Sequence, residues 1–599
     1  MGEFWSNLSV LTSARHRKSL WPGAVTEYSG YAGISELNPM KKYSHTGLAC
    51  AALVLAGCVA APVQTPLPAS SSSFSSAEQA LTYHVMMGEL ALQRGASKTG
   101  VQQYARAAQS STDPTLAQYA TLLAYKDGDN SQALELTHRW LQLVPKDNDA
   151  RHFEAVLNTR LGNVNIAVSE FEKLLAESPG ENLQLISDLL GQETNAKEGL
   201  PVMQKLVAGW PESAQAHFAL AQLAMHYQDA PLAIEETRRA LILKSDFDQA
   251  LILEARALLV VGNNSQALQL LKARVVAQPD NTRVHLAYAT VLAQTEQNVL
   301  AQTEFTAINK QHPNDPDALY SLGLLALQAN NLNAAKDYFT RLLKTGQRDN
   351  DARYFLGNTS ELAKRYPEAL HWYQQVNGGK NWLTAQISVA RVLMSQHKPD
   401  VARSYIDDIV GMDPDDGVQF RIAEAQLFSD AGDSKTALQV FNQGLMEDPG
   451  NPDLLYARAL LQEDIGDALA AENSLRQILA EQPDNADALN ALGYMLALHS
   501  TNYQEARGYI EKALLLKPDD PAIIDSMGWV EYRLGNYPQA LSYLRKAYAQ
   551  LADPEIAAHL TEVLWVSGEK QEAHRIWSSA LKQHPGDAAL LAVGQRFSP

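Results

Sequence analysis

The chain has 599 residues, of which 46% are hydrophobic and 19% are charged, and this composition is ordinary for a folded protein. Its 67 acidic residues outnumber the 49 basic ones and give a formal net charge of -18. Such an acidic balance argues against a protein that follows the phosphates of a nucleic acid.

The N-terminal part contains a predicted signal peptide. A basic head at residues 40–42 (MKK) precedes the apolar run 47–57, which ends in Leu-Ala-Gly directly before Cys58. The run is too short to span a bilayer as a helix and is typical of a signal-peptide core. Because this signal peptide starts at its own methionine, we expect residues 1–39 to be a non-translated or removed extension.

The Leu-Ala-Gly-Cys ending resembles the lipobox of bacterial lipoproteins. This resemblance implies a lipoprotein signal peptide at 40–57 and lipidation of Cys58, which becomes the mature N-terminus. No aspartate follows the cysteine, which in that family implies an outer-membrane lipoprotein facing the periplasm. A plain secretory signal with an incidental cysteine is the alternative. Cys50 would leave with the signal peptide, so we expect no thiol and no disulfide in the mature body.

Residues 58–80 begin with that cysteine and are rich in Pro, Ser and Ala. Such a composition cannot bury a core, so we expect a tether between the anchor and the rest of the chain.

From residue 81 to 587 one pattern recurs with a period of about 34 residues. The small residues that mark the successive units are Gly100, Ala133, Ala167, Gly199, Ala233, Ala267, Ala301, Ala335, Ala369, Ala402, Ala437, Ala471, Ala506, Ala540 and Ala573. In many units a glycine lies five residues earlier, where it predicts the end of a first helix. An apolar or aromatic residue often follows four positions later, on the same face of a second helix.

These spacings resemble the tetratricopeptide-repeat family over roughly 85% of the chain. The resemblance implies an all-α fold, a superhelical solenoid of about 15 helix-turn-helix units whose first helices line a groove. The unit around Gly199 departs from the pattern because it is short and lacks the usual small-aromatic pair. The segment 588–599 contains one more apolar stretch, and we expect it to cap the last repeat.

We expect no enzymatic activity, no cofactor and no metal site. The chain has no His-Glu-x-x-His, no phosphate-binding Gly-x-x-x-x-Gly-Lys loop and no Gly-x-Ser-x-Gly elbow. The Ser-x-x-Lys match at 567–570 falls in a repeat turn. The aspartates at 412–416 and 517–520 sit beside prolines, where helix capping explains them better than calcium binding.

The family register identifies candidates for the partner-binding groove on the first helices, and aromatic residues are prominent among them. The candidates are Phe218, Met225, His226, Tyr320, Leu324, Tyr354, Asn358, Tyr456, Asn490, Tyr494, Asp525, Trp529, Tyr532 and Arg533. Several could instead belong to the core, and we expect about half to be exposed. The lysines with which some repeats clamp a peptide carboxylate are missing, so recognition of chaperone tails is not supported.

The layout of lipobox, tether and long repeat array resembles the lipoprotein adaptor that partners a periplasmic carboxyl-terminal processing protease. That family implies a non-enzymatic scaffold that binds and activates a serine protease and brings it substrates such as peptidoglycan cross-link hydrolases. An assembly scaffold for exopolysaccharide, pilus or outer-membrane protein machinery has the same layout and is the alternative. A polysaccharide-binding or cell-wall enzyme would need a pair of exposed carboxylates, and the sequence singles out none.

Overall fold

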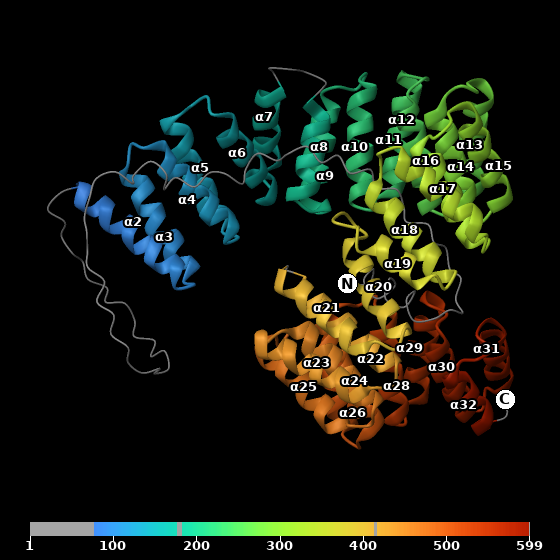
Figure 1. The fold of residues 1–599 in the computed structure, drawn as a ribbon. Coiled ribbons are helices and arrows are strands. Elements are labelled where there is room, and N and C mark those ends of the chain that lie inside the picture. Colours follow the sequence, from blue (N-terminus) through green and yellow to red (C-terminus); the bar gives the residue numbers. More distant parts are fainter. Residues whose placement is uncertain (1–76, 176–181, 413–415, 598–599) are drawn as a thin grey trace. The chain divides into compact units, whose positions relative to one another are not determined.

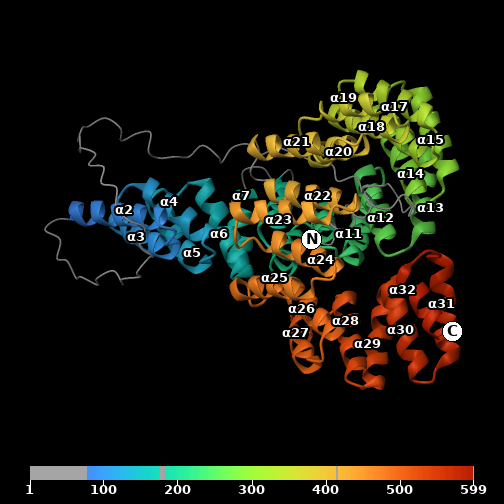
Figure 2. The same cartoon turned by 60° about the horizontal axis from the view of Figure 1, so that its bottom comes forward.

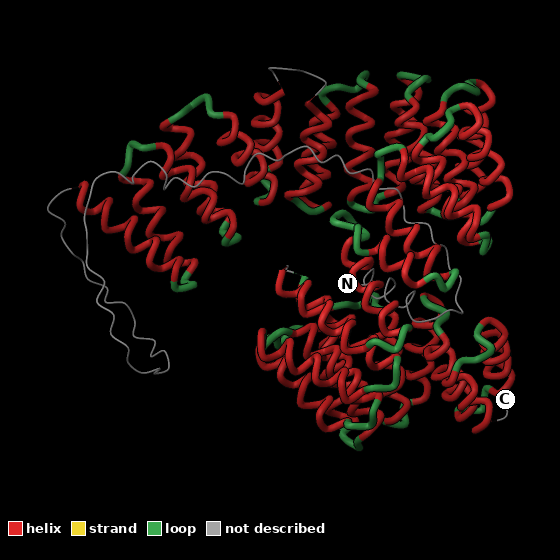
Figure 3. Tube along the Cα trace, viewed as in Figure 1, coloured by secondary structure: helices red, strands yellow, loops and turns green. Residues whose placement is uncertain are grey.

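The computed structural model describes residues 77–175, 182–412 and 416–597, and every regular element in these ranges is an α-helix (Figure 3). The predicted extension at 1–39, the signal peptide at 40–57, Cys58 and most of the tether lie outside the described residues. The prediction of an all-α fold built from repeated helix-turn-helix units is confirmed.

The described helices form fifteen consecutive pairs and one final helix. In chain order the pairs are α2 (Ala77–Gln93) and α3 (Ser97–Ser110), α4 (Pro114–Lys126) and α5 (Asn130–Leu143), α6 (Asn148–Arg160) and α7 (Val164–Leu175), α8 (Asn182–Glu193) and α9 (Ala196–Ala208), α10 (Ala214–His226) and α11 (Ala230–Leu243), α12 (Asp248–Val260) and α13 (Asn264–Ala277), α14 (Thr282–Gln294) and α15 (Asn298–Gln311), α16 (Pro316–Gln328) and α17 (Leu332–Lys344), α18 (Asp349–Leu362) and α19 (Tyr366–Tyr373), α20 (Trp382–Ser395) and α21 (Pro399–Met412), α22 (Gly417–Asp430) and α23 (Ser434–Glu447), α24 (Pro452–Asp464) and α25 (Ala468–Glu481), α26 (Ala486–His499) and α27 (Tyr503–Leu516), α28 (Pro521–Arg533) and α29 (Tyr537–Gln550), and α30 (Pro554–Val566) and α31 (Lys570–Gln583). The last helix is α32 (Ala588–Phe597).

The chain divides into two compact units within α16, between Ser321 and Leu322. We call the unit before this point the N-terminal unit and the unit after it the C-terminal unit. Inside each unit, helices that follow one another in the chain pack side by side (Figures 1 and 2). First helices of successive repeats also contact each other, as α26 contacts α28 and α28 contacts α30.

The turn inside each pair depends on a residue with left-handed backbone. Five residues before the small residue of the second helix, eight units carry a glycine with φ between 73° and 94°. These glycines are Gly95, Gly128, Gly162, Gly262, Gly432, Gly466, Gly535 and Gly568. Glycine is favoured there because it has no Cβ to clash in this conformation.

Five further units hold the same left-handed turn without glycine. The residues are Gln228, Glu296, Asn330, Lys364 and His397, and their φ values lie between 56° and 63°. The geometry of the repeat therefore overrides the local preference of these side chains.

The two helices of a pair approach closely where the first helix carries a small residue. A Cβ at Gly493 would lie 2.5 Å from Cγ1 of Ile510 and 2.8 Å from the Ala506 carbonyl oxygen. A Cβ at Gly528 would lie 2.6 Å from Cγ of Leu544. Small residues at these positions are thus required by packing.

At the C-terminal end, α32 packs against α30 and α31. Its Leu590 is fully buried, and the Leu590 carbonyl accepts a 2.9 Å hydrogen bond from Nε1 of Trp577. This helix occupies the segment that we expected to cap the array.

Candidate protein-interaction surface

In the N-terminal unit, the candidates on α10 are mostly covered. Phe218 is half-buried, and its ring lies 4.9 Å from that of Phe247. Met225 is half-buried, and His226 is exposed. Tyr320 on α16 is 8% exposed and therefore belongs largely to the interior.

In the C-terminal unit before α26, Leu324 is buried, whereas Tyr354, Asn358 and Tyr456 are half-buried. Burial raises the pKa of Tyr354, and burial together with nearby carboxylates raises that of Tyr456 to about 12. Both phenols therefore stay protonated at neutral pH.

The expectation that about half of the candidates would be exposed is wrong. Of the fourteen, His226 alone is exposed, and four are buried, namely Tyr320, Leu324, Asp525 and Trp529. The reason is that first helices of neighbouring repeats pack against each other, so large side chains on that face also fill the space between helices.

The structure brings one group of candidates together with residues that the sequence did not single out. We call it the tyrosine–histidine surface and define it by Asn490, Tyr494, Asp525, Trp529, Glu555 and His559 on α26, α28 and α30. Asn490 and Asp525 are each the fifth residue of their helix, and Tyr494 and Trp529 are each the ninth. Equivalent positions of consecutive first helices therefore form two rows.

A chain of hydrogen bonds crosses this surface. Nδ1 of His559 donates to Oδ2 of Asp525 at 2.8 Å, and the Tyr494 hydroxyl donates to Oε1 of Glu555 at 2.9 Å. Nε2 of His559 lies 3.2 Å from the Tyr494 hydroxyl oxygen, which is then free to accept. With both ring nitrogens facing acceptors, the arrangement favours the imidazolium form of His559.

The electrostatics of His559 agree with this assignment. Burial alone would lower the pKa of His559, but the charge and hydrogen bond of Asp525, with Glu555 and Glu562 nearby, raise it above its ordinary value. Burial, the charge of Glu555 and the hydrogen bond to it raise the pKa of Tyr494.

Two aromatic rings, those of Trp529 and Tyr494, lie near the imidazole of His559. Trp529 stacks on His559 with ring centroids 4.2 Å apart and an interplanar angle of 27°. Tyr532 lies 5.2 Å from Trp529 and donates to Glu562 at 3.1 Å. Arg533 is directed to another neighbour, because it stands over the ring of Tyr503 at 4.9 Å.

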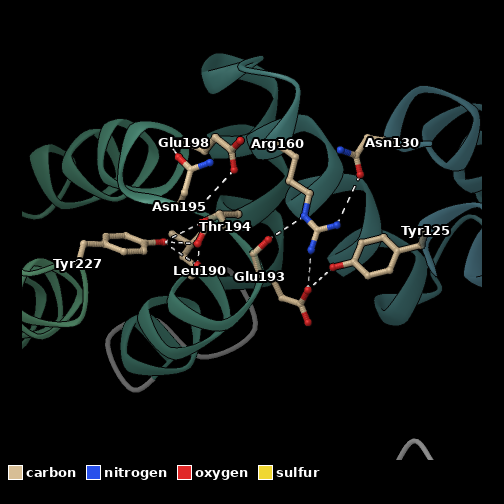
Figure 4. A network of polar contacts seen from close by, with 9 residues as sticks. All are labelled: Tyr125, Asn130, Arg160, Leu190, Glu193, Thr194, Asn195, Glu198 and Tyr227. Carbon is tan, nitrogen blue, oxygen red and sulfur yellow. Dashed lines mark hydrogen bonds and ion pairs between the residues drawn. The ribbon is translucent and has the colours of Figure 1, made fainter. Parts of the chain in front are cut away.

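The irregular fourth repeat is held by a different polar network, which Figure 4 shows. Glu193, the last residue of α8, accepts from Nη2 of Arg160 at 2.9 Å and from the Tyr125 hydroxyl. Nε of Arg160 also donates to the Glu193 carbonyl at 2.7 Å, and the guanidinium lies 4.3 Å from the centre of the Tyr125 ring. Three repeats thus meet at one guanidinium.

On the other side of α8, Tyr227 fills the space that a larger second-helix residue would need. Its hydroxyl donates to the Leu190 carbonyl at 2.7 Å and lies 2.8 Å from Oγ1 of Thr194. A Cβ at Gly199 would lie 2.5 Å from this hydroxyl. The turn itself is stabilised by a capping box in which Asn195 and Glu198 each accept from the other's backbone N–H.

These network residues were not predicted, although the sequence carries a signal for them. Tyr125, Arg160, Glu193 and Tyr227 are separated by 35, 33 and 34 residues, so they occupy one column of the repeat at the end of each first helix. A search for polar residues that recur in one column would have found them.

Within the described ranges, no group of three or more His, Cys, Asp or Glu side chains is arranged to hold a metal ion. In the same part of the chain, no helix combines the length and the apolar composition that crossing a membrane requires.

Comparison with known proteins identifies the repeats. A tetratricopeptide-repeat sequence profile matches residues 185–246, 320–379 and 456–521. The TPR repeat-containing protein PA4667 of Pseudomonas aeruginosa is 33% identical over 528 residues, which cover 85% of this chain and 89% of that protein.

Solved structures with low sequence identity and low TM-scores also match parts or most of the chain. Yeast Tom70 is 14% identical, with 87% of this chain and 100% of that chain covered and a TM-score of 0.34. PilW, a type IV pilus biogenesis factor, is 16% identical, with 36% of this chain and 99% of that chain covered and a TM-score of 0.29. The repeated helix pairs and the relationship to the Pseudomonas protein together place this chain in the tetratricopeptide-repeat family.

Proposed function

We propose that this chain is a non-enzymatic scaffold, anchored by a lipid on Cys58 in the outer membrane and facing the periplasm. In this proposal it binds and activates a carboxyl-terminal processing serine protease and brings it substrates such as peptidoglycan cross-link hydrolases. The observation that carries the proposal is the layout of a lipobox, a Ser/Pro-rich tether and an array of helix pairs.

The family supports the coarser part of this proposal. Tetratricopeptide repeats generally act as non-catalytic surfaces for protein–protein interaction, and nothing in the matched segments indicates an enzymatic domain. A fold supports many functions, so the identity of the partner rests on the resemblance of the layout.

The proposed mechanism is proximity. A scaffold that holds protease and substrate together turns their encounter into an intramolecular event at an effective concentration of roughly millimolar. Affinity for the pair then rises without any new contact between protease and substrate.

The decisive experiment is affinity purification of the tagged protein from membranes, in cells whose candidate protease has its nucleophile replaced so that substrates are trapped. Recovery of the protease together with wall hydrolases is the expected result. Recovery of neither would contradict the adaptor function. Recovery of β-barrel or secretion components instead would favour the assembly scaffold.

The anchor has its own test. Mass spectrometry of the mature N-terminus should find acyl chains on Cys58, and Cys58→Ser should release the protein from the membrane fraction. Cys50→Ser is the matched control, because Cys50 lies in the apolar run and should be removed with the signal peptide. Intact Met1 on the exported protein would rule out the lipoprotein assignment.

A further inference from the structure

Three polar side-chain atoms on the tyrosine–histidine surface are buried without a hydrogen-bond partner. They are Oδ1 of Asn490, Oδ1 of Asp525 and Nε1 of Trp529. Asp525 and Trp529 are only 5% and 7% exposed. Native proteins pair nearly all buried polar atoms, because an unpaired one is costly. Three such atoms on two adjoining first helices indicate a site that a ligand completes.

The unpaired atoms define what the ligand must offer. Oδ1 of Asn490 and Oδ1 of Asp525 are acceptors and need donors, whereas Nε1 of Trp529 is a donor and needs an acceptor. An extended peptide presents backbone N–H and C=O groups in alternation, so one short segment can supply both kinds of partner.

The charge of the surface specifies the ligand further. His559 neutralises one carboxylate through its bond to Asp525, and Arg596 pairs with Glu562 at 2.8 Å. Glu555 is exposed, and the group that donates to it is the neutral Tyr494 hydroxyl. The surface therefore keeps a negative charge after its internal pairs are formed, and it favours a positively charged ligand.

The aromatic side chains of the tyrosine–histidine surface also favour a positively charged ligand. Tyr494 and Trp529 occupy equivalent positions on α26 and α28, and Trp529 already stacks on the imidazolium of His559. The half-buried Tyr494 ring lies beside the carboxylate of Glu555, and a lysine or arginine side chain there gains from both the ring and the opposite charge.

We propose that the tyrosine–histidine surface binds an extended segment of a partner protein through a lysine or arginine side chain. The positive group lies against Glu555 and the free oxygen of Asp525, and the backbone of the segment pairs with Asn490 and Trp529. Because these atoms are covered in the free protein, side chains of the surface move when the segment enters. This inference rests on the proposed scaffold function and adds the chemistry of the segment that the scaffold recognises.

Fluorescence anisotropy with the full chain in detergent tests the proposal. The probe is a fluorescein-labelled peptide, Gly-Ser-Lys-Ala-Arg-Ala-Ser-Gly, and the reference peptide carries glutamate at both charged positions. We expect saturable binding of the basic peptide and none of the acidic one. Glu555→Gln should weaken binding about tenfold, the loss expected when one close charge pair is removed.

Glu511→Gln is the matched control, because Glu511 is exposed on the second helix α27 and its replacement changes the net charge equally. It should change the dissociation constant less than twofold. Equal weakening by both variants would show that the peptide senses overall acidity, and failure to bind at about 1 mM peptide would show that no such site exists. Either result overturns the proposal.

The scaffold function is tested separately by repeating the membrane purification with Glu555→Gln. Loss of a partner that the Glu511→Gln protein still recovers supports the proposed site. Unchanged recovery of every partner overturns this site and leaves the scaffold function standing.

Discussion

The fourth repeat and the thirteenth and fourteenth repeats solve the same packing problem in different ways. In α26–α29, small residues on the first helices let apolar side chains of the second helices come close, as Gly493 does for Ile510. In α8–α9, the guanidinium of Arg160 and the phenols of Tyr125 and Tyr227 add polar contacts to an apolar cluster that includes Leu190 and Met203. The difference teaches that a weak repeat motif does not imply a weak junction, because polar contacts between repeats can supplement the apolar contacts within one.

The largest effect should come from filling the close contact in the thirteenth repeat. Gly493→Val places a side chain against Ile510 and the Ala506 carbonyl, and overpacking of this kind costs about 3 kcal/mol. Amide hydrogen exchange should speed up in α26–α29 and stay unchanged in α8–α9, since coupling in repeat arrays is between neighbours.

Gly508→Ala is the control for that substitution. A Cβ at Gly508 meets nothing within 4 Å, and the position lies inside α27. Alanine should therefore stabilise the helix by about 0.5–1 kcal/mol. Equal destabilisation by both variants would contradict the packing argument.

Breaking the polar network should have the next largest effect. Arg160→Met removes two hydrogen bonds to Glu193 and the contact over Tyr125, and we expect a loss of about 2 kcal/mol. Exchange should accelerate in α6 and α8. Arg239→Met is the control, because this exposed arginine lies 4.0 Å from Glu235 and its loss should cost at most about 0.5 kcal/mol. If Arg160→Met and Arg239→Met lost the same small amount of stability, the network would contribute nothing and the prediction would be wrong.

A smaller effect is expected at the other side of α8. Tyr227→Phe keeps the ring that fills the space beside Gly199 and removes the hydroxyl that bonds the Leu190 carbonyl. The loss should be about 1 kcal/mol, visible as faster exchange in α8 and α9. Tyr537→Phe, at an exposed tyrosine, should change exchange in neither region.

The smallest expected effect is a pH dependence of stability that arises from His559. The pKa of His559 is raised in the folded protein, so its contribution to stability is complete below the ordinary histidine pKa and is lost as pH rises through the folded value. The melting temperature of the wild type minus that of His559→Gln, measured between pH 5.5 and 8.5, isolates the contribution of His559. The difference is needed because burial raises the pKa of Glu424 to about 7, so Glu424 also loses its favourable protonation over part of this range.

The fold could be predicted from the sequence because the repeat is specified by short-range residue patterns. The period from Ala133 to Ala573, the glycines before many of the second helices and the prolines at unit ends each act within a few residues. The left-handed φ at Gly128 and its seven glycine equivalents follows directly from that pattern.

The surfaces were harder to predict because their contacts join different repeats. Tyr494 and His559 are 65 residues apart, and Tyr125 and Glu193 are 68 apart. The family register identified Tyr494, Asp525 and Trp529, but it could not show that packing between first helices buries Asp525 and Trp529. Whether the candidates bind a partner stays a prediction.

The left-handed turns without glycine have a consequence under mechanical force. Each one costs about 1 kcal/mol relative to glycine, and five of them lie between residues 228 and 397, whereas the repeats nearer the two ends carry glycine at most of these turns. A pull on the two ends of a linear array loads every junction equally, so rupture begins where the least work is needed. In a single-molecule stretching experiment, we expect the middle repeats to unfold first, while the repeats nearer the two ends stay folded.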